Sequence, residues 1–128
     1  MITINVPFLP PSVNHYTLPG RFGGRYKTKE AKKFETDFAY FVNGQRVVGK
    51  SFSVSIYITL GKGERGDTDN YLKLTVDALA DNGVFVSPKG KELSDAYVDQ
   101  LYVCRDRKSR PETSSMVIKV SSLRRFHL

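Results

Sequence analysis

The chain opens with an alternation of apolar and polar residues that is typical of a strand with one buried face. The apolar positions are Ile2, Ile4, Val6 and Phe8. Pro7 has no amide hydrogen to donate to a neighbouring strand, so we expect this strand to end there or to lie at the edge of a sheet. The stretch that follows, as far as Lys27, contains several glycines and basic residues and is predicted to be a loop.

A helical period replaces the alternation after Thr28, a residue type suited to capping the start of a helix. Apolar residues then recur every three or four positions, at Ala31, Phe34, Phe38, Phe41 and Val42. This spacing predicts an amphipathic helix of about four turns. We interpret its aromatic stripe as core packing rather than as a platform for stacking bases, and we expect Asn43-Gly44 to end the helix.

Two further periodic segments follow. The first alternates cleanly and predicts a strand, with apolar residues at Phe52, Val54, Ile56, Ile58 and Leu60. The second predicts a helix from residue 68 or 69 to residue 79 or 80, ended by Asn82-Gly83. The residues expected on the buried side of this helix are Leu72, Thr75, Val76 and Leu79.

Two more strands are expected near residues 98–105 and 116–121, so the element order is β-α-β-α-β-β. We predict an α+β fold: a mixed β-sheet of about four strands with two helices packed on one face. The other face is then free for a partner subunit or for DNA. A length of 128 residues fits a single domain over 1–128, and we expect the basic tail, 121–128, to fray.

The distribution of charged residues along the chain indicates a candidate function. The chain holds 20 Lys and Arg against 13 Asp and Glu, and nucleic acid is the commonest polyanionic partner of a basic protein. Residues 67–99 nevertheless carry seven acids and three lysines, a net charge of −4, whereas the remainder carries 17 bases and six acids, net +11. Carboxylates repel phosphates, but a nuclease needs a basic surface together with carboxylates that hold metal ions. The alternative is an uneven scatter of acids that pair with nearby bases.

The single cysteine, Cys104, excludes an intrachain disulfide and a cysteine-based zinc site. It falls in a predicted strand, so we expect it to be buried rather than nucleophilic. The sequence shows no signal peptide and no run of eighteen apolar residues. We therefore expect a cytoplasmic protein that does not enter a membrane.

Candidate chemistry concentrates where the predicted central strand passes into the second helix. Asp67 and Asp69 are two residues apart, so in extended backbone their side chains point to the same side. Lys73 and Asp77 follow Asp69 at intervals of four residues, which places all three on one stripe of the helix. Such a group can bind metal and stabilise charge on a phosphate under attack. Alternatively, the acids cap the helix and pair with Lys73 on its surface.

The segment resembles the signature of the RusA-type Holliday-junction resolvases, a family of small dimeric DNA endonucleases. The matching residues are Asp67-Thr68-Asp69-Asn70, Lys73, Asp77-Ala78-Leu79, Asn82-Gly83-Val84-Phe85 and Ser94-Asp95-Ala96. Nearer the N-terminus, the chain is similar to the family's Pro-Pro-Ser-x-Asn-x-Tyr element, in Pro10-Pro11-Ser12-Val13-Asn14-His15-Tyr16. The two blocks keep their order and rough spacing, so the resemblance covers most of the chain.

The resemblance implies an endonuclease of DNA recombination and repair that uses Mg²⁺, for which Mn²⁺ can substitute, and no small-molecule cofactor. It implies a homodimer that resolves four-way junctions by paired symmetric nicks, from a bacterial or phage source. Asp67, Asp69 and Asp95 match the metal-binding catalytic residues and Lys73 the catalytic lysine, while supporting positions fall on Asn70 and Asp77. The alternative function is a non-catalytic basic module that binds branched DNA.

The chain departs from the family pattern around the third acid. Ser94 stands where the family commonly has Asp, and about six extra residues, 88–93, precede it. The run of arginines that some members carry before the first Asp is absent here. The third metal ligand therefore stays open among Asp95, Glu92 and Asp99. The basic residues that we expect at DNA phosphates are Arg21, Arg25, Lys27, Lys89 and Lys91.

Overall fold

The computed structural model describes residues 1–11, 16–64 and 68–123, and of residues 68–70 it describes the backbone alone. Within this part of the chain the elements are β1 (Ile2–Val6), β2 (Thr17–Pro19), β3 (Arg25–Lys27), α1 (Lys29–Val42), β4 (Val47–Val48), β5 (Phe52–Thr59), α2 (Thr68–Asp81), β6 (Phe85–Val86), the 3-10 helix η2 (Asp95–Tyr97), β7 (Val98–Asp106) and β8 (Ser115–Ser122).

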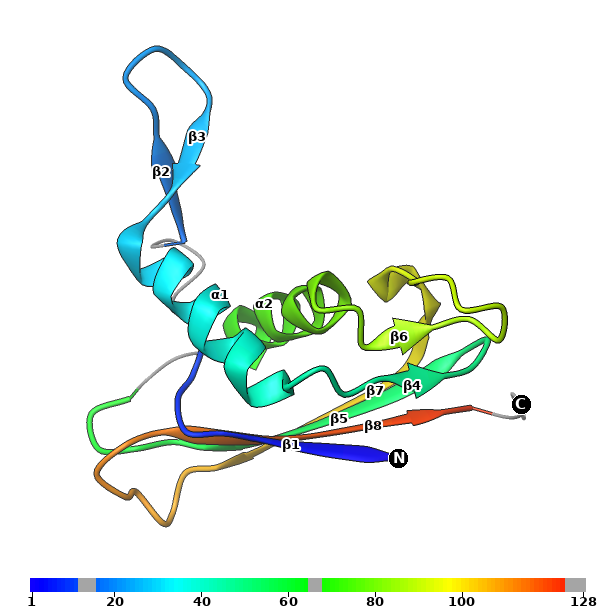
Figure 1. Ribbon diagram of the computed structural model, residues 1–128. Helices are drawn as coiled ribbons and strands as arrows, with labels where there is room; N and C mark the ends of the chain where they lie inside the picture. Colours follow the sequence, from blue (N-terminus) through cyan, green and yellow to red (C-terminus); the bar gives the residue numbers. More distant parts are fainter. Residues whose placement is uncertain (12–15, 65–67, 124–128) are drawn as a thin grey trace.

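A mixed four-stranded sheet forms one layer of the molecule, with strand order β1-β8-β5-β7 (Figure 1). Strand β8 is antiparallel to both β1 and β5, whereas β5 and β7 are parallel. Parallel neighbours need a crossover connection, and α2 lies within the one that joins β5 to β7. Together with the two helices on one face of the sheet, this arrangement confirms the predicted fold class. The order β-α-β-α-β-β holds for the four strands of this sheet and the two helices, and β2, β3, β4 and β6 are additional to it.

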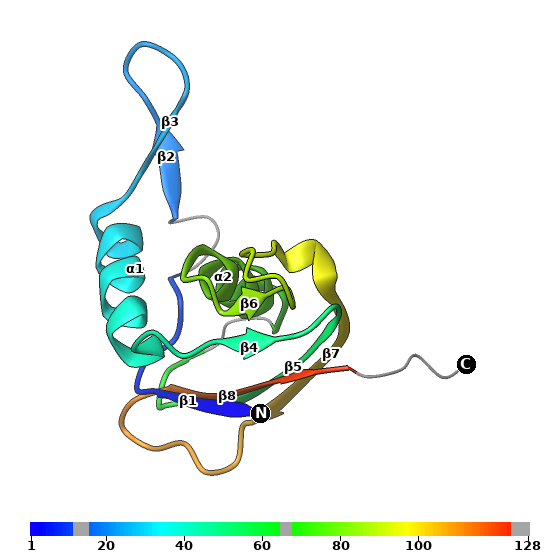
Figure 2. The same ribbon diagram turned by 45° about the vertical axis from the view of Figure 1, so that its right-hand side comes forward.

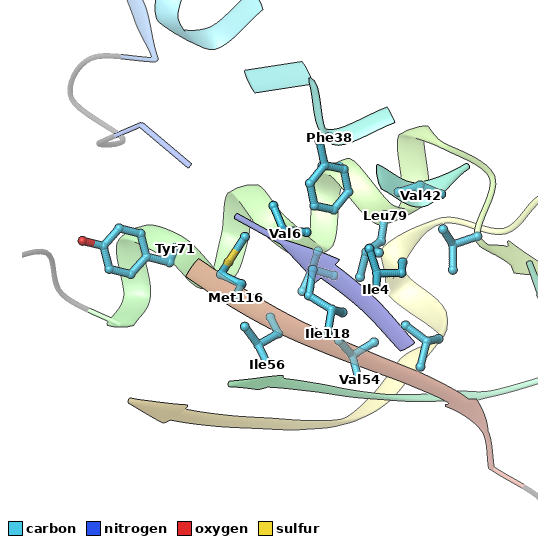
Figure 3. Packing of buried hydrophobic residues seen from close by; sticks show 14 of the residues in the cluster. Ile4, Val6, Phe38, Val42, Val54, Ile56, Tyr71, Leu79, Met116 and Ile118 are labelled. Atoms are coloured by element: carbon cyan, nitrogen blue, oxygen red, sulfur yellow. The ribbon is translucent and has the colours of Figure 1, made fainter. Parts of the chain in front are cut away.

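Helix α1 begins and ends where the sequence predicts. The Thr28 side chain accepts a hydrogen bond from the amide of Ala31 at 3.2 Å, and Asn43 ends the helix with a φ of 51°. Phe34 and Phe38 are buried, which confirms the interpretation of the aromatic stripe as core. Figure 3 shows Phe38 and Leu79 lying over the apolar side of the sheet.

Helix α2 buries a wider face than the pattern predicts. Thr75 and Leu79 are fully buried and Val76 is nearly so, but Tyr71, Leu74 and Ala78 are buried as well. Leu72 was expected in the core and is only half-buried. Leu72 packs against the edge of the core, and its other side lines a hollow towards η2 and the edge strand β7, so the expectation holds only in part.

The predicted N-terminal loop contains an antiparallel hairpin of β2 and β3, and this is the largest correction to the expected fold. Gly23 and Gly24 reverse the chain with φ values of 90° and 71°, which are accessible mainly to glycine. The hairpin left little trace in the sequence because each strand has three residues and nearly all of their side chains are exposed. No alternation between buried and exposed positions could develop.

The sheet face opposite the helices is exposed and partly aromatic. The Tyr57 and Tyr102 rings lie 5.8 Å apart, and the Lys119 ammonium lies 5.5 Å from the Tyr57 ring. Cys104 is also exposed, so the expectation that it is buried is wrong. It pairs in register with Tyr57, whose side chain is likewise exposed, and so lies on a strand face that no described helix covers.

The C-terminal strand is longer than expected. Ser121 and Ser122 belong to β8 and pair with β5, so the prediction that the chain frays from residue 121 is wrong for these two. Residues 124–128 lie outside the described part of the chain.

Candidate active site

Helix α2 carries two of the four predicted catalytic residues and both of the predicted supporting residues. The backbone of Asp69 and Asn70 lies in its first turn, and Lys73 and Asp77 follow one and two turns later. At a rise of 1.5 Å per residue, Lys73 lies about 6 Å and Asp77 about 12 Å along the helix from Asp69. Asp67 and the side chains of Asp69 and Asn70 lie outside the described part of the structure.

The 3-10 helix η2 packs against α2 (Figure 2). This packing brings Asp95 to Asp77. Their carboxyl groups are within hydrogen-bonding reach of each other. Two acids that are well separated in the sequence therefore meet at one place on the helix stripe that also carries Lys73.

This placement changes the acidity of Asp77. Its pKa lies above the usual aspartate value, first because the carboxyl is partly buried, and then because of the hydrogen bond and the negative charge of Asp95. The positive charge of Lys73 acts in the opposite direction. A fold that holds two carboxyl groups together against their repulsion is of the kind found at sites that bind cations or transfer protons.

A hollow of about 470 Å³ opens beside this acid pair. Lys73 and Asp95 line it, together with apolar side chains from α2 and β7: Leu72, Val76, Val98 and Leu101. The hollow thus combines a positive and a negative group with an apolar wall. Such a wall lowers the local dielectric constant and strengthens the action of both charges on anything bound there.

The other two candidates for the third acid have partners elsewhere. Glu92 lies 3.4 Å from the guanidinium of Arg46, and Asp99 accepts a hydrogen bond from the Ser51 hydroxyl at 2.6 Å. Among the described acids, Asp95 is therefore the one of these three that reaches Asp77.

The loop that leads towards Asp67 is held by Arg110. Its Nη1 donates hydrogen bonds to the carbonyl oxygens of Gly61, at 3.0 Å, and Glu64, at 2.8 Å. The Glu64 carboxylate also accepts a hydrogen bond from the Tyr71 hydroxyl at 2.8 Å, which joins the loop to α2. Nothing in the sequence indicates this role for Arg110, because it depends on how the turn between β7 and β8 folds back.

A second cavity, of about 400 Å³, lies between the base of the hairpin and α2, and Asp77 lines it too. Here the Tyr16 hydroxyl donates a 2.5 Å hydrogen bond to Glu35, and the Lys27 ammonium lies 2.7 Å from the same oxygen. Burial raises the pKa of Glu35, but the hydrogen bonds from Lys27 and Tyr16 outweigh it, so the pKa is lowered. Lys27, expected at a DNA phosphate, is thus engaged by Glu35.

The remaining predicted DNA contacts lie on two exposed segments. Arg21 and Arg25 belong to the hairpin, whereas Lys89 and Lys91 lie in the loop after β6, at the far end of the helix layer in Figure 1. The two segments lie towards opposite ends of α2 in Figure 1, and each carries two of the predicted DNA contacts.

Within residues 1–11, 16–64 and 68–123, no three or more His, Cys, Asp or Glu side chains lie close enough together to hold a metal ion; Asp67 and the Asp69 side chain are outside this part of the chain. No helix in the described part of the chain has the length and apolar character to cross a membrane. Neither a model of a known protein family nor a curated protein matches the chain.

Proposed function

We propose that this protein is a Mg²⁺-dependent, structure-specific DNA endonuclease that resolves four-way junctions. The observation that carries the proposal is the meeting of Asp77 and Asp95 beside Lys73, on the helix whose first turn contains Asp69. The motif resemblance to the RusA-type resolvases supports it, as does the basic charge of the chain outside residues 67–99.

The donor set fits magnesium. Mg²⁺ prefers carboxylate oxygens and keeps several of its waters. A cation favours the ionised form of Asp77, which burial and the neighbouring Asp95 disfavour. We assign Asp67, Asp69 and Asp95 to one or two ions, since Asp95 lies beside Asp77, about 12 Å along α2 from Asp69. Asp77 is the neighbour that fixes the orientation of the Asp95 carboxylate. When bound, the ion supplies Lewis acidity towards a water and a phosphate oxygen.

The protein's own side chains then perform three tasks. Lys73, one turn after Asp69, offsets the negative charge that develops on the scissile phosphate. Asp77 can donate a hydrogen bond to Asp95 when it is protonated and accept one when it is ionised, so the two side chains stay together in either state. Leu72 and Val76 restrict water on one side of the hollow, which strengthens these electrostatic interactions.

A four-way junction has two-fold symmetry, so paired nicks require two sites related by a two-fold axis. We therefore propose a homodimer with one site in each subunit. The exposed sheet face that carries Tyr57 and Tyr102 is a suitable contact surface for the second copy, because it is aromatic and lies on the opposite side of the sheet from the acid pair. Binding should follow DNA shape rather than sequence and weaken steeply with salt.

The test is to incubate the purified protein with an immobile four-way junction, labelled on each strand in turn, with and without Mg²⁺. We expect paired nicks at symmetric positions only when Mg²⁺ is present, and little cutting of linear duplex, flaps, forks or RNA. Asp69→Asn should abolish cutting and leave junction binding as tight or tighter, because a charge that repels phosphate is removed. A wild-type protein that binds the junction and never cuts it is the non-catalytic binding module instead.

A further inference from the structure

The β2–β3 hairpin presents an aromatic side chain almost wholly to solvent. Phe22, in the turn between its strands, is 94% exposed, more than any other large apolar side chain in the described residues. Figures 1 and 2 show the hairpin standing out from the helix layer, with its turn as the farthest point. Single exposed apolar residues are common on proteins, so this exposure gains meaning only from its surroundings.

The surroundings of Phe22 are positively charged. Residues 17–27 contain three basic residues and no acid, and the first acid in the chain is Glu30. The Arg21 guanidinium lies 5.6 Å from the centre of the Phe22 ring, close enough for a cation–π interaction. Lys27 is engaged by Glu35, so Arg21 and Arg25 supply the charge near the turn. A basic, aromatic tip of this kind suits a polyanion whose bases have accessible faces.

The hairpin is braced as an arm. The Arg25 guanidinium donates to the side chain and the carbonyl of Thr17, at 2.8 and 3.0 Å, across the two strands. At the turn, the Gly20 amide donates to the carbonyl of Gly24. At the base, the Thr28 amide donates to the carbonyl of Tyr16, whose hydroxyl is tied to Glu35 of α1. At about 3.3 Å per residue, the turn stands about 17 Å from the base.

The base of this arm adjoins the candidate active site. Tyr16 and Lys27, at the base of the hairpin, line the same cavity as Asp77 of the acid pair. DNA whose backbone reaches the acid pair would therefore pass beside the arm. The distance from the base to the turn corresponds to about five stacked nucleotides at 3.4 Å each, so Phe22 would meet bases a few steps from the phosphate at the acid pair.

We propose that the hairpin is a wedge that recognises the branch point of the DNA: Phe22 inserts at an opened base step, and Arg21 and Arg25 contact the flanking phosphates. The inference rests on the proposed function, since it states how the same site selects its substrate. Apolar side chains that enter a base step must unstack it. At a branch point the stack is already interrupted, so insertion costs less there than in linear duplex.

The experiment compares Phe22→Ala with Tyr40→Ala, which removes an aromatic ring that is 76% exposed on α1. Both are tested on a four-way junction and a linear duplex in EDTA, with 2-aminopurine placed at the branch point or in an arm. We expect wild-type protein to change the fluorescence at the branch point but not in the arm. Phe22→Ala should lose this change and bind the junction about 10-fold more weakly, with duplex binding unaltered, whereas Tyr40→Ala should match the wild type.

Several results would overturn the wedge. One is unchanged junction affinity and branch-point fluorescence for Phe22→Ala, and another is an equal loss of affinity for junction and duplex. A third is unaltered junction binding together with Phe22-dependent binding to vesicles of anionic phospholipid, which would make the hairpin a membrane contact. Binding is measured in EDTA, which prevents cutting, so the two proposals can fail separately. A Phe22-dependent fluorescence change at the branch point without any cutting in Mg²⁺ would contradict only the proposed function. Cutting in Mg²⁺ with no effect of Phe22→Ala on junction binding would contradict only the wedge.

Discussion

Replacing Asp77 with asparagine should make the protein more stable at neutral pH, although it removes a residue of the candidate active site. The raised pKa of Asp77 means that its ionised form is disfavoured in the folded state, by burial and by Asp95. An amide has no charge to bury and can still donate a hydrogen bond to Asp95. The substitution therefore removes an electrostatic cost and keeps the contact.

The size of the effect follows from the exposure of the pair. Asp77 is partly buried but Asp95 is exposed, so we use the lower limit of the repulsion, about 1 kcal/mol for two charges about 4 Å apart in water. An unfolding entropy of about 2.1 cal/mol/K per residue gives about 0.27 kcal/mol/K for a chain of 128 residues. The expected rise in Tm for Asp77→Asn is therefore about 4 °C at pH 7.

The dependence on pH gives the reasoning a second check. A carboxyl with a raised folded pKa weakens the fold above that pKa, and the loss disappears below the unfolded value of about 3.9. The Tm advantage of Asp77→Asn should thus be full at pH 7 and shrink as the pH falls towards 3.9. Mg²⁺ should shrink it as well, because a bound cation stabilises the wild type more than the variant.

Thermal unfolding followed by circular dichroism measures these differences, with Asp37→Asn as the matched control. Asp37 pairs with Lys33 at 2.6 Å on α1, so its loss should lower Tm by about 1–2 °C. If Asp77→Asn lowers Tm at pH 7 as well, or if its advantage persists unchanged at acid pH, Asp77 and Asp95 do not repel as described.

Two further substitutions test the scaffold around the site. Phe38→Ala removes a fully buried ring from the core beneath α1, and should cost about 3–5 kcal/mol in a denaturant unfolding titration; a loss below about 1 kcal/mol would contradict the packing. Arg110→Ala should cost about 1.5–3 kcal/mol and slow junction cutting, because two hydrogen bonds that hold the loop before Asp67 are lost. Arg107→Ala, an exposed neighbour, should change neither, and equal behaviour of the two arginine variants would rule out this role for Arg110.

Periodicity was sufficient to predict the elements that bury one face. The alternation in β5 and the spacing of Phe34 and Phe38 reflect real contact with the core, and Thr28 and Asn43 act as the caps that their residue types suggest. The β2–β3 hairpin was missed because its residues stand in solvent and therefore obey no burial pattern.

The location of the candidate site could be predicted from the sequence, but the contacts between its residues could not. The four-residue intervals from Asp69 placed Lys73 and Asp77 on one stripe of α2, as a helix requires. The meeting of Asp77 with Asp95 depends on the path of the chain through β6 and η2, which no local pattern encodes. The same holds for Arg110, and for the link from Tyr16 to Glu35, which join segments distant in the sequence.

The most direct test of the central claim compares two neighbouring acids on a four-way junction under single-turnover conditions with Mg²⁺. Asp95 meets Asp77 at α2, whereas Asp99 is hydrogen-bonded to Ser51. We predict that Asp95→Asn slows cutting by about 100-fold or more, without weaker junction binding, and that Asp99→Asn cuts close to the wild-type rate. Wild-type cutting by Asp95→Asn, or a loss confined to Asp99→Asn, would show that the acid pair on α2 is not the catalytic centre.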